Sequence, residues 1–128
     1  MKGDATFVAP ATPFGHSGVA VIRINGPLSK NILSELSRTR IPKPKSVTLT
    51  KLYDSKENLL DECLVTYFVS PSSYTGDDMV EISCHGNPVI VDKIIKTINN
   101  HGARPAEPGE FTKRAFINGK LDLLQAEA

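Results

Sequence analysis

Two charged residues lie inside apolar, strand-like runs, where a side chain with a charge needs a partner. Arg23 interrupts the run 19–24, and Glu81 stands between Val80 and Ile82. Burying an unpaired charge is costly, so each group must reach an anion, a donor or solvent. A carboxylate can accept two parallel N–H bonds from one edge of a flat ring. The structural alternatives are an ion pair for Arg23 and a solvent-facing strand position for Glu81.

Two further side chains could complete a binding site with them. Lys120 follows Gly119 at a joint between two helical patterns, where an ammonium can reach into a cleft as a point charge. The alternative is an ordinary exposed lysine. Tyr74 begins the turn Tyr74-Thr75-Gly76, where its ring could stack on a flat ligand or cover the core.

Metal and nucleotide motifs are absent from the sequence. Cys84 and His85 are adjacent, and neighbours in a strand point to opposite faces, so they are poorly placed to share a metal or to form a catalytic dyad. Metal-binding Cys-x-x-Cys spacing and the phosphate-binding pattern Gly-x-x-x-x-Gly-Lys-Ser/Thr do not occur. We expect no metal site, and no GTP hydrolysis by this chain alone.

The composition is that of a single soluble domain. The chain has 128 residues, 40% hydrophobic residues, a net charge of +1 and a mean hydropathy of −0.16. No apolar run approaches the roughly 20 residues of a membrane-spanning helix, and no signal peptide is recognisable. Cys63 and Cys84 are too few for a disulfide scaffold and are predicted to be reduced core thiols. We expect a cytoplasmic protein that has no membrane partner.

Hydrophobic periodicity predicts an α+β fold. The pattern gives strands over 5–9, 18–24, 46–53, 59–69 and 78–84, helices that begin near Pro27 and Asn87, and two terminal helical patterns that meet at Gly119. A polar turn at 54–58 predicts that the third and fourth strands form a hairpin. We therefore expect a mixed, largely antiparallel sheet with two main helices packed on it.

The loop over 38–45 is basic and contains two prolines. It carries Arg38, Arg40, Lys43 and Lys45. It is either a solvated connector or a patch that contacts the phosphates of a partner.

Four motifs in the same order resemble those of one known family. Residues 108–128 read PGEFTKRAFINGKLDLLQAEA, residues 9–15 read APATPFG, residues 21–26 read VIRING, and residues 74–81 read YTGDDMVE, followed by His85-Gly86. Together they resemble the N-terminal domain of the tRNA modification GTPases called MnmE or TrmE. The resemblance covers nearly the whole chain.

The resemblance implies an aminomethyltransferase-like folate-binding domain. Its expected ligand is 5-formyltetrahydrofolate or a related one-carbon folate. Glu81 would hold the pterin ring and Lys120 the carboxylates of the glutamate tail, with Arg23 and Tyr74 also contacting the folate. Residues 1–120 would form the folate-binding and dimerisation domain, and 121–128 would begin a helix leading into a further domain.

The resemblance also implies partners. They are a second copy of the chain in a homodimer, a flavin-dependent protein of the MnmG or GidA type, and tRNA. GTP, Mg²⁺ and K⁺ would bind only in a GTPase domain outside this chain. Two alternatives stay open: a folate-dependent domain of the aminomethyltransferase type, or a dimerisation module without ligand.

Overall fold

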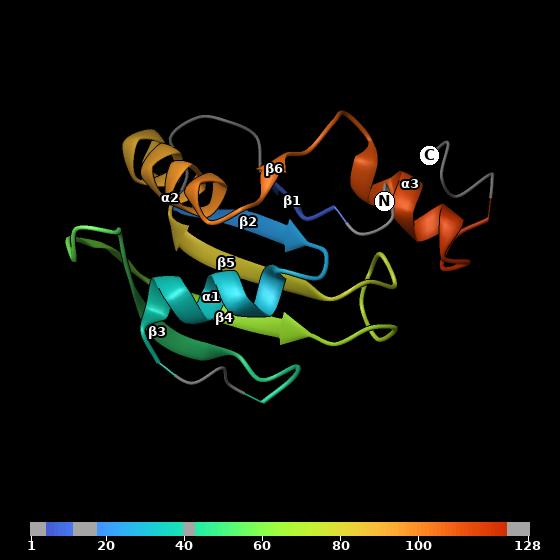
Figure 1. The fold of residues 1–128 in the computed structure, drawn as a ribbon, viewed down its shortest axis with the longest axis horizontal. Coiled ribbons are helices and arrows are strands. Elements are labelled where there is room, and N and C mark those ends of the chain that lie inside the picture. The colour runs from blue at the N-terminus through green and yellow to red at the C-terminus, as the bar shows by residue number, and fades with distance from the viewer. Residues whose placement is uncertain (1–4, 12–17, 40–42, 123–128) are drawn as a thin grey trace.

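The computed structural model describes residues 5–11, 18–39 and 43–122, which form one six-stranded sheet and three helices (Figure 1). The strands are β1 (Phe7–Pro10), β2 (Val19–Asn25), β3 (Thr48–Tyr53), β4 (Leu59–Phe68), β5 (Met79–His85) and β6 (Arg104–Pro105). The helices are α1 (Ser29–Ser37), α2 (Pro88–Asn100) and α3 (Glu110–Ile117).

The sheet is mixed and mostly antiparallel, as the sequence predicts. Its strand order is β3-β4-β5-β2-β1-β6, and only the pairing of β1 with the two-residue β6 is parallel. The predicted hairpin is confirmed as β3 and β4, joined by a turn in which the Asp54 carboxylate accepts the N–H groups of Lys56 and Asn58. The α+β fold class is therefore confirmed.

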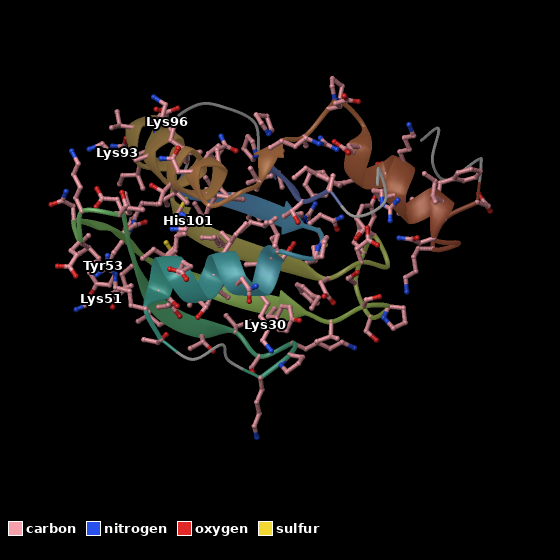
Figure 2. The ribbon with its side chains drawn as sticks, viewed as in Figure 1. Lys30, Lys51, Tyr53, Lys93, Lys96 and His101 are labelled. Carbon is pink, nitrogen blue, oxygen red and sulfur yellow. The ribbon has the colours of Figure 1, made fainter. Side chains whose placement is uncertain are left out.

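Helices α1 and α2 cover the same face of the sheet (Figure 1). The apolar stripe of α1 is buried at Ile32, Leu33 and Leu36, and that of α2 at Ile94 and Ile98. Lys93 and Lys96 extend from the opposite side of α2, away from the sheet (Figure 2). This division into an apolar and a charged face is what the helical periodicity predicts.

The start of α1 differs from the prediction. Pro27 was expected in the first helical turn with Leu28 in the apolar stripe, but the helix begins at Ser29 and Leu28 is its half-exposed N-cap residue. The Ser29 hydroxyl is buried and donates to the carbonyl of Gly26, which holds the chain in a turn before the helix can start.

The other face of the sheet, which we call the open face, lies opposite α1 and α2. Residues alternate along a strand, so the inner side chains Ile22 and Ile82 are buried while their neighbours Arg23 and Glu81 point to the open face. Among the apolar side chains of this face, Leu49 is 61% exposed and its neighbour on β4, Leu64, is 46% exposed.

Both cysteines are buried in the core and free, in agreement with the prediction of core thiols. Burial raises the pKa of the Cys84 thiol to about 11, which leaves it protonated and unreactive at neutral pH. Within the described residues, the structure has no helix that is long and apolar enough to cross a membrane.

Two predictions fall outside the described residues. One is most of the opening motif at 9–15, since residues 12–17 are not described, and the other is most of the helix expected to begin at residue 121, since residues 123–128 are not described. The proposed domain boundary at residue 120 stays a prediction.

Candidate functional site

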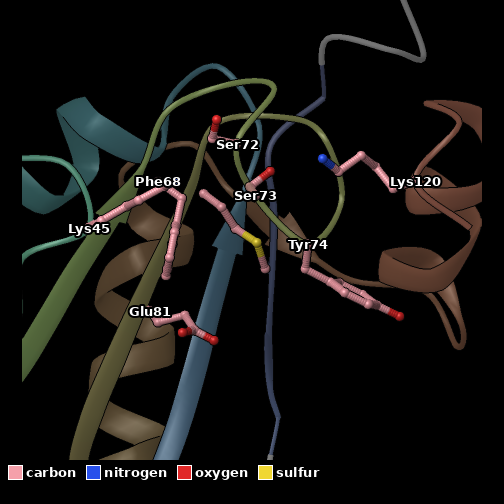
Figure 3. Close-up of a pocket in the computed structure, with 8 residues that line it drawn as sticks. Lys45, Phe68, Ser72, Ser73, Tyr74, Glu81 and Lys120 are labelled. Atoms are coloured by element: carbon pink, nitrogen blue, oxygen red, sulfur yellow. The ribbon is translucent and has the colours of Figure 1, made fainter.

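A pocket of about 490 Å³ opens beside the ends of β4 and β5 (Figure 3). Eight residues line it: Lys45, Phe68, Ser72, Ser73, Tyr74, Met79, Glu81 and Lys120. We call it the Glu81 pocket. Three of the four candidates from the sequence, Tyr74, Glu81 and Lys120, line this one cavity although they come from a loop, a strand and the segment after α3.

The fourth candidate, Arg23, reaches the pocket through Glu81. Strand register places the two residues directly opposite each other on β2 and β5, and Nε of Arg23 donates to Oε2 of Glu81 at 2.7 Å. The guanidinium carbon also lies 6.0 Å from the centre of the Tyr74 ring. Arg23 itself lines a second, smaller pocket of about 320 Å³. The ion pair predicted as the structural alternative for Arg23 is therefore present, and its partner is Glu81.

Tyr74 joins the loop at 69–78 to α3. Its hydroxyl lies 3.2 Å from Oγ1 of Thr112, and 46% of the residue is exposed. The ring therefore forms a wall of the pocket and does not cover the core. Of the two interpretations left open by the sequence, the structure excludes only the second.

Lys120 is exposed and held at its backbone rather than by its side chain. Gly119 has φ +75°, the left-handed conformation that ends a helix, and the Lys120 N–H donates to the carbonyl of Ala115 at 2.8 Å. The side chain then extends back toward the loop that carries Ser73 (Figure 3). The predicted left-handed helix stop at Gly119 is confirmed, whereas most of the second helix expected after it lies outside the described residues.

The loop at 69–78 is fixed by the carboxylate of Asp77. Asp77 accepts hydrogen bonds from Arg114 at 2.9 and 3.0 Å, from Asn25 at 3.0 Å and from Asn118 at 3.0 Å. Burial would raise the pKa of Asp77, but the hydrogen bonds from Arg114 and Asn25, the Arg114 charge and the Asn118 amide outweigh burial and lower it. The carboxylate is therefore ionised at neutral pH.

Sequence reasoning missed Lys45, Phe68 and Met79 as pocket residues. Phe68 and Met79 pair across β4 and β5 at the end of the ladder and line the apolar part of the pocket. Strand alternation could have suggested this pair, because both share the face of Glu81. Lys45 has φ +65°, and its N–H donates to the carbonyl of Tyr67, which brings it to the pocket rim.

The rest of the basic loop behaves as a connector where the structure describes it. The guanidinium of Arg38 donates to Oε1 of Glu57 at 2.6 Å. Its central carbon lies over the Tyr53 ring, 5.4 Å from the ring centre. Arg40 lies outside the described residues.

His85 and Cys84 point to opposite faces, as predicted. Cys84 is buried, whereas the His85 side chain is 70% exposed and pairs with Asp61 at 2.8 Å. Burial would raise the pKa of Asp61, but hydrogen bonds from the backbone and side chain of His85 lower it.

Comparison with known proteins identifies the family. The profile described as GTP-binding protein TrmE N-terminus matches residues 6–120. The chain belongs to this TrmE N-terminal family. Relatives named tRNA modification GTPase MnmE are 49% identical in Francisella philomiragia over 100% of the chain, 49% in Aquifex aeolicus over 94%, and 44% in Sulfurovum over 99%. The chain spans only 27–28% of the length of these relatives.

In this TrmE N-terminal domain, charged and apolar side chains line different parts of the pocket. The Glu81 carboxylate lies at one part of the wall and the Lys120 ammonium comes from another (Figure 3). Phe68 and Met79 supply apolar surface. Such an arrangement can hold a flat molecule that has N–H donors at one end and negative charge at the other.

Proposed function

We propose that this chain binds a reduced folate, 5-formyltetrahydrofolate or a related one-carbon form, in the Glu81 pocket and pairs with a second copy of itself. The observation that carries the proposal is that Glu81 and Lys120, 39 positions apart in the sequence, line one cavity of about 490 Å³. That volume lies in the range typical of small-molecule sites, roughly 300–1,000 Å³.

The acid suits the pterin end of the ligand. A pterin presents an amino group beside a ring N–H, and a carboxylate can accept both. One oxygen of Glu81 already accepts from Arg23, yet an ionised carboxylate has about four acceptor positions, so capacity for the ring is left. Arg23 then orients the acid and supports the folate through it.

The cations suit the opposite end. The glutamate tail of a folate carries carboxylates, and Lys120 and Lys45 both line the pocket. Both lysine side chains are exposed, so each contributes about one screened charge contact and not a buried pair. Tyr74 and Phe68 supply aromatic walls for the flat part of the ligand, and residues of this chain therefore fit all three parts of a folate.

The role of the whole protein follows from the family. The relatives are named tRNA modification GTPases, and in the proposed pathway bound folate supplies a one-carbon unit for the wobble uridine of a tRNA. The proposed partners are a flavin-dependent protein of the MnmG or GidA type and tRNA, with GTP, Mg²⁺ and K⁺ bound elsewhere in the longer protein. This chain would position the carrier by an aminomethyltransferase-like pocket.

Calorimetry with 5-formyltetrahydrofolate tests the proposal. The unchanged chain is expected to bind, and Glu81→Ala is expected to weaken binding roughly ten- to a hundredfold, the value of one or two charge-assisted hydrogen bonds. Glu62→Ala is the matched control, because Glu62 is an exposed acid on β4 that does not line the pocket. Equal affinity of the Glu81 variant and the control would remove Glu81 from the site.

A dimerisation module without ligand is the second candidate, supported by the exposed Leu49 and Leu64 on the open face. A second copy of the chain could bury this surface. Size-exclusion chromatography with and without folate separates the two functions. A folded dimer that shows no folate binding at millimolar ligand would favour the module.

A further inference from the structure

Helix α3 is attached to the domain with little apolar burial. Ala115 is its one fully buried residue, whereas Phe116 and Ile117 are 43% and 55% exposed. Phe111 contacts Phe7 edge to face with ring centres 5.0 Å apart. An eight-residue helix is not stable by itself, so other contacts must hold it in place.

Polar contacts supply that attachment. Arg114 and Asn118, one turn apart on the same side of α3, both donate to the Asp77 carboxylate at 2.9–3.0 Å. Asn118 also donates to the Thr75 carbonyl at 2.7 Å. The side chains of Arg114 and Asp77 are only 17% and 21% exposed, which makes this a well-shielded, charge-assisted contact. We call Asp77, Arg114 and Asn118 the Asp77 clamp.

The clamp and the Glu81 pocket share the same loop. Ser72, Ser73 and Tyr74 line the pocket, and Asp77 follows within three residues of Tyr74. The hydroxyl of Tyr74, which lines the pocket, lies 3.2 Å from Oγ1 of Thr112 on α3. The loop therefore contacts α3 through the clamp and borders the pocket at the same time.

Gly76 shows how tightly the loop meets the end of α3. A Cβ added there would lie 2.9 Å from Cβ of Asn118 and 3.3 Å from Cγ of Lys120. The Lys120 N–H is in turn bonded to Ala115 in the last turn of the helix. The backbone of Lys120 and the first part of its side chain are therefore placed by how α3 docks on this loop.

We propose that the Asp77 clamp couples docking of α3 to occupancy of the Glu81 pocket, with Arg114 and Asn118 acting as positioning residues for Lys120. This inference rests on the proposed function, since a folate is the ligand that contacts Glu81 and Lys120 together. A ligand held by both residues ties β5 to the segment after α3. By linkage, a change that undocks α3 weakens ligand binding, and the bound ligand strengthens docking of α3 by the same factor.

A double-mutant cycle measures the coupling. Lys120→Ala and Arg114→Ala are each expected to weaken binding of 5-formyltetrahydrofolate about three- to tenfold in calorimetry. Because Arg114 acts through Lys120, the double variant is expected to bind folate no more weakly than whichever single variant has the lower affinity. Lys113→Ala, which removes an exposed charge next to Arg114 on the same helix, is expected to leave the affinity unchanged.

The cycle has outcomes that overturn the proposal. Losses that multiply, to roughly ten- to a hundredfold in the double variant, would show that Arg114 does not act through Lys120. Unchanged affinity in Arg114→Ala would show the same. If Arg114→Ala does not fold, Asn118→Ala replaces it. This substitution removes the hydrogen bond from Asn118 to Asp77 and leaves the Arg114–Asp77 pair in place.

Amide hydrogen exchange gives a readout that a purely structural clamp would not move. Saturating folate is expected to slow exchange of the Asn118, Gly119 and Lys120 amides several-fold in the unchanged chain. Exchange that folate leaves unchanged, in a chain that calorimetry shows to bind it, overturns the coupling alone. Failure of the unchanged chain to bind folate overturns the proposed function together with the coupling, so the two failures are distinguishable.

Discussion

Arg23 and Glu81 face each other across β2 and β5, and their ion pair lies at the border of the pocket, with an Nε–Oε2 distance of 2.7 Å. Their side chains are 36% and 29% exposed, so the pair is partly shielded and still reachable from the pocket. The sequence left a structural ion pair and a ligand contact as alternatives for Arg23, and a solvent-facing strand position and a ligand contact for Glu81. The geometry makes them compatible, because an acid held by a neighbouring strand can still accept from a ligand.

Removal of Arg23 is expected to weaken folate binding less than removal of Glu81. Arg23→Gln leaves Glu81 in the pocket but without its charged partner, so a loss of roughly three- to tenfold is expected. In the Glu81→Ala background the same change is expected to have little further effect, because its action passes through the acid. Calorimetry on the four proteins checks this, and a full additional loss in the double variant would mean that Arg23 contacts the ligand directly.

The lowered pKa of Asp77 predicts that the clamp is sensitive to acid. The folded pKa of the Asp77 carboxyl lies below the ordinary value of 3.8. Such a carboxyl stabilises the fold fully at any pH above its pKa in the unfolded chain, which is about 3.9. This contribution is lost as the pH falls through the folded pKa. The unchanged chain should therefore lose stability as the pH falls below about 4 and through the folded pKa, in part through Asp77.

Asp77→Asn isolates that contribution. At pH 7 the variant is expected to be less stable by about 1–3 kcal/mol, because charge-assisted bonds to Arg114 are weakened. Its melting temperature is expected to fall less between pH 5 and pH 3 than that of the unchanged chain. Parallel pH profiles of the two proteins would contradict the assignment of the acid sensitivity to Asp77.

Much of the fold could be predicted from local patterns. The hairpin of β3 and β4, the apolar stripes of α1 and α2 and the helix stop at Gly119 depend on neighbours in the sequence, and all are present. The two-residue β6 could not be foreseen, because it pairs with β1 about 97 positions earlier and has no periodicity of its own.

The site shows the same limit. The motifs point to Glu81, Tyr74 and Lys120, and the pocket brings these three together. The Asp77 clamp joins two segments that are far apart in the sequence, the loop at 69–78 and α3, through side-chain geometry. An aspartate before a strand reads simply as a turn residue. Lys45 reaches the pocket through a left-handed backbone that no pattern predicts for a lysine.

Leu64→Asp is expected to disrupt pairing with a second copy. Leu64 is 46% exposed on the open face, next to Leu49 on β3, and a buried unpaired carboxylate at an interface is costly. The variant should elute as a folded monomer at concentrations where the unchanged chain elutes as a dimer. Val89→Asp on the solvent face of α2 is the control, because Val89 is 61% exposed on the opposite side of the sheet. Dimers of the Leu64 variant would place the contact elsewhere.

Gly76→Ala tests whether close approach of the loop sets the place of Lys120. Gly76 has φ +85°, and its missing side chain leaves room for Asn118 and Lys120. Alanine is therefore expected to cost about 1–2 kcal/mol for the left-handed backbone, and to push the loop and the Lys120 segment apart. Folate binding should weaken about as much as in Lys120→Ala.

Gly109→Ala separates these two effects. Gly109 has φ +72°, yet a Cβ there would meet no atom within 4 Å, so the change carries the backbone cost without a steric clash. Thermal unfolding should show a loss of stability in both variants, larger in Gly76→Ala because of the added clash, whereas calorimetry should show weaker folate binding only in Gly76→Ala. Equal folate affinities in the two variants would mean that the contact of Gly76 with Lys120 does not shape the pocket. Backbone strain, which both variants carry, would then be enough to explain the effect of Gly76→Ala on binding.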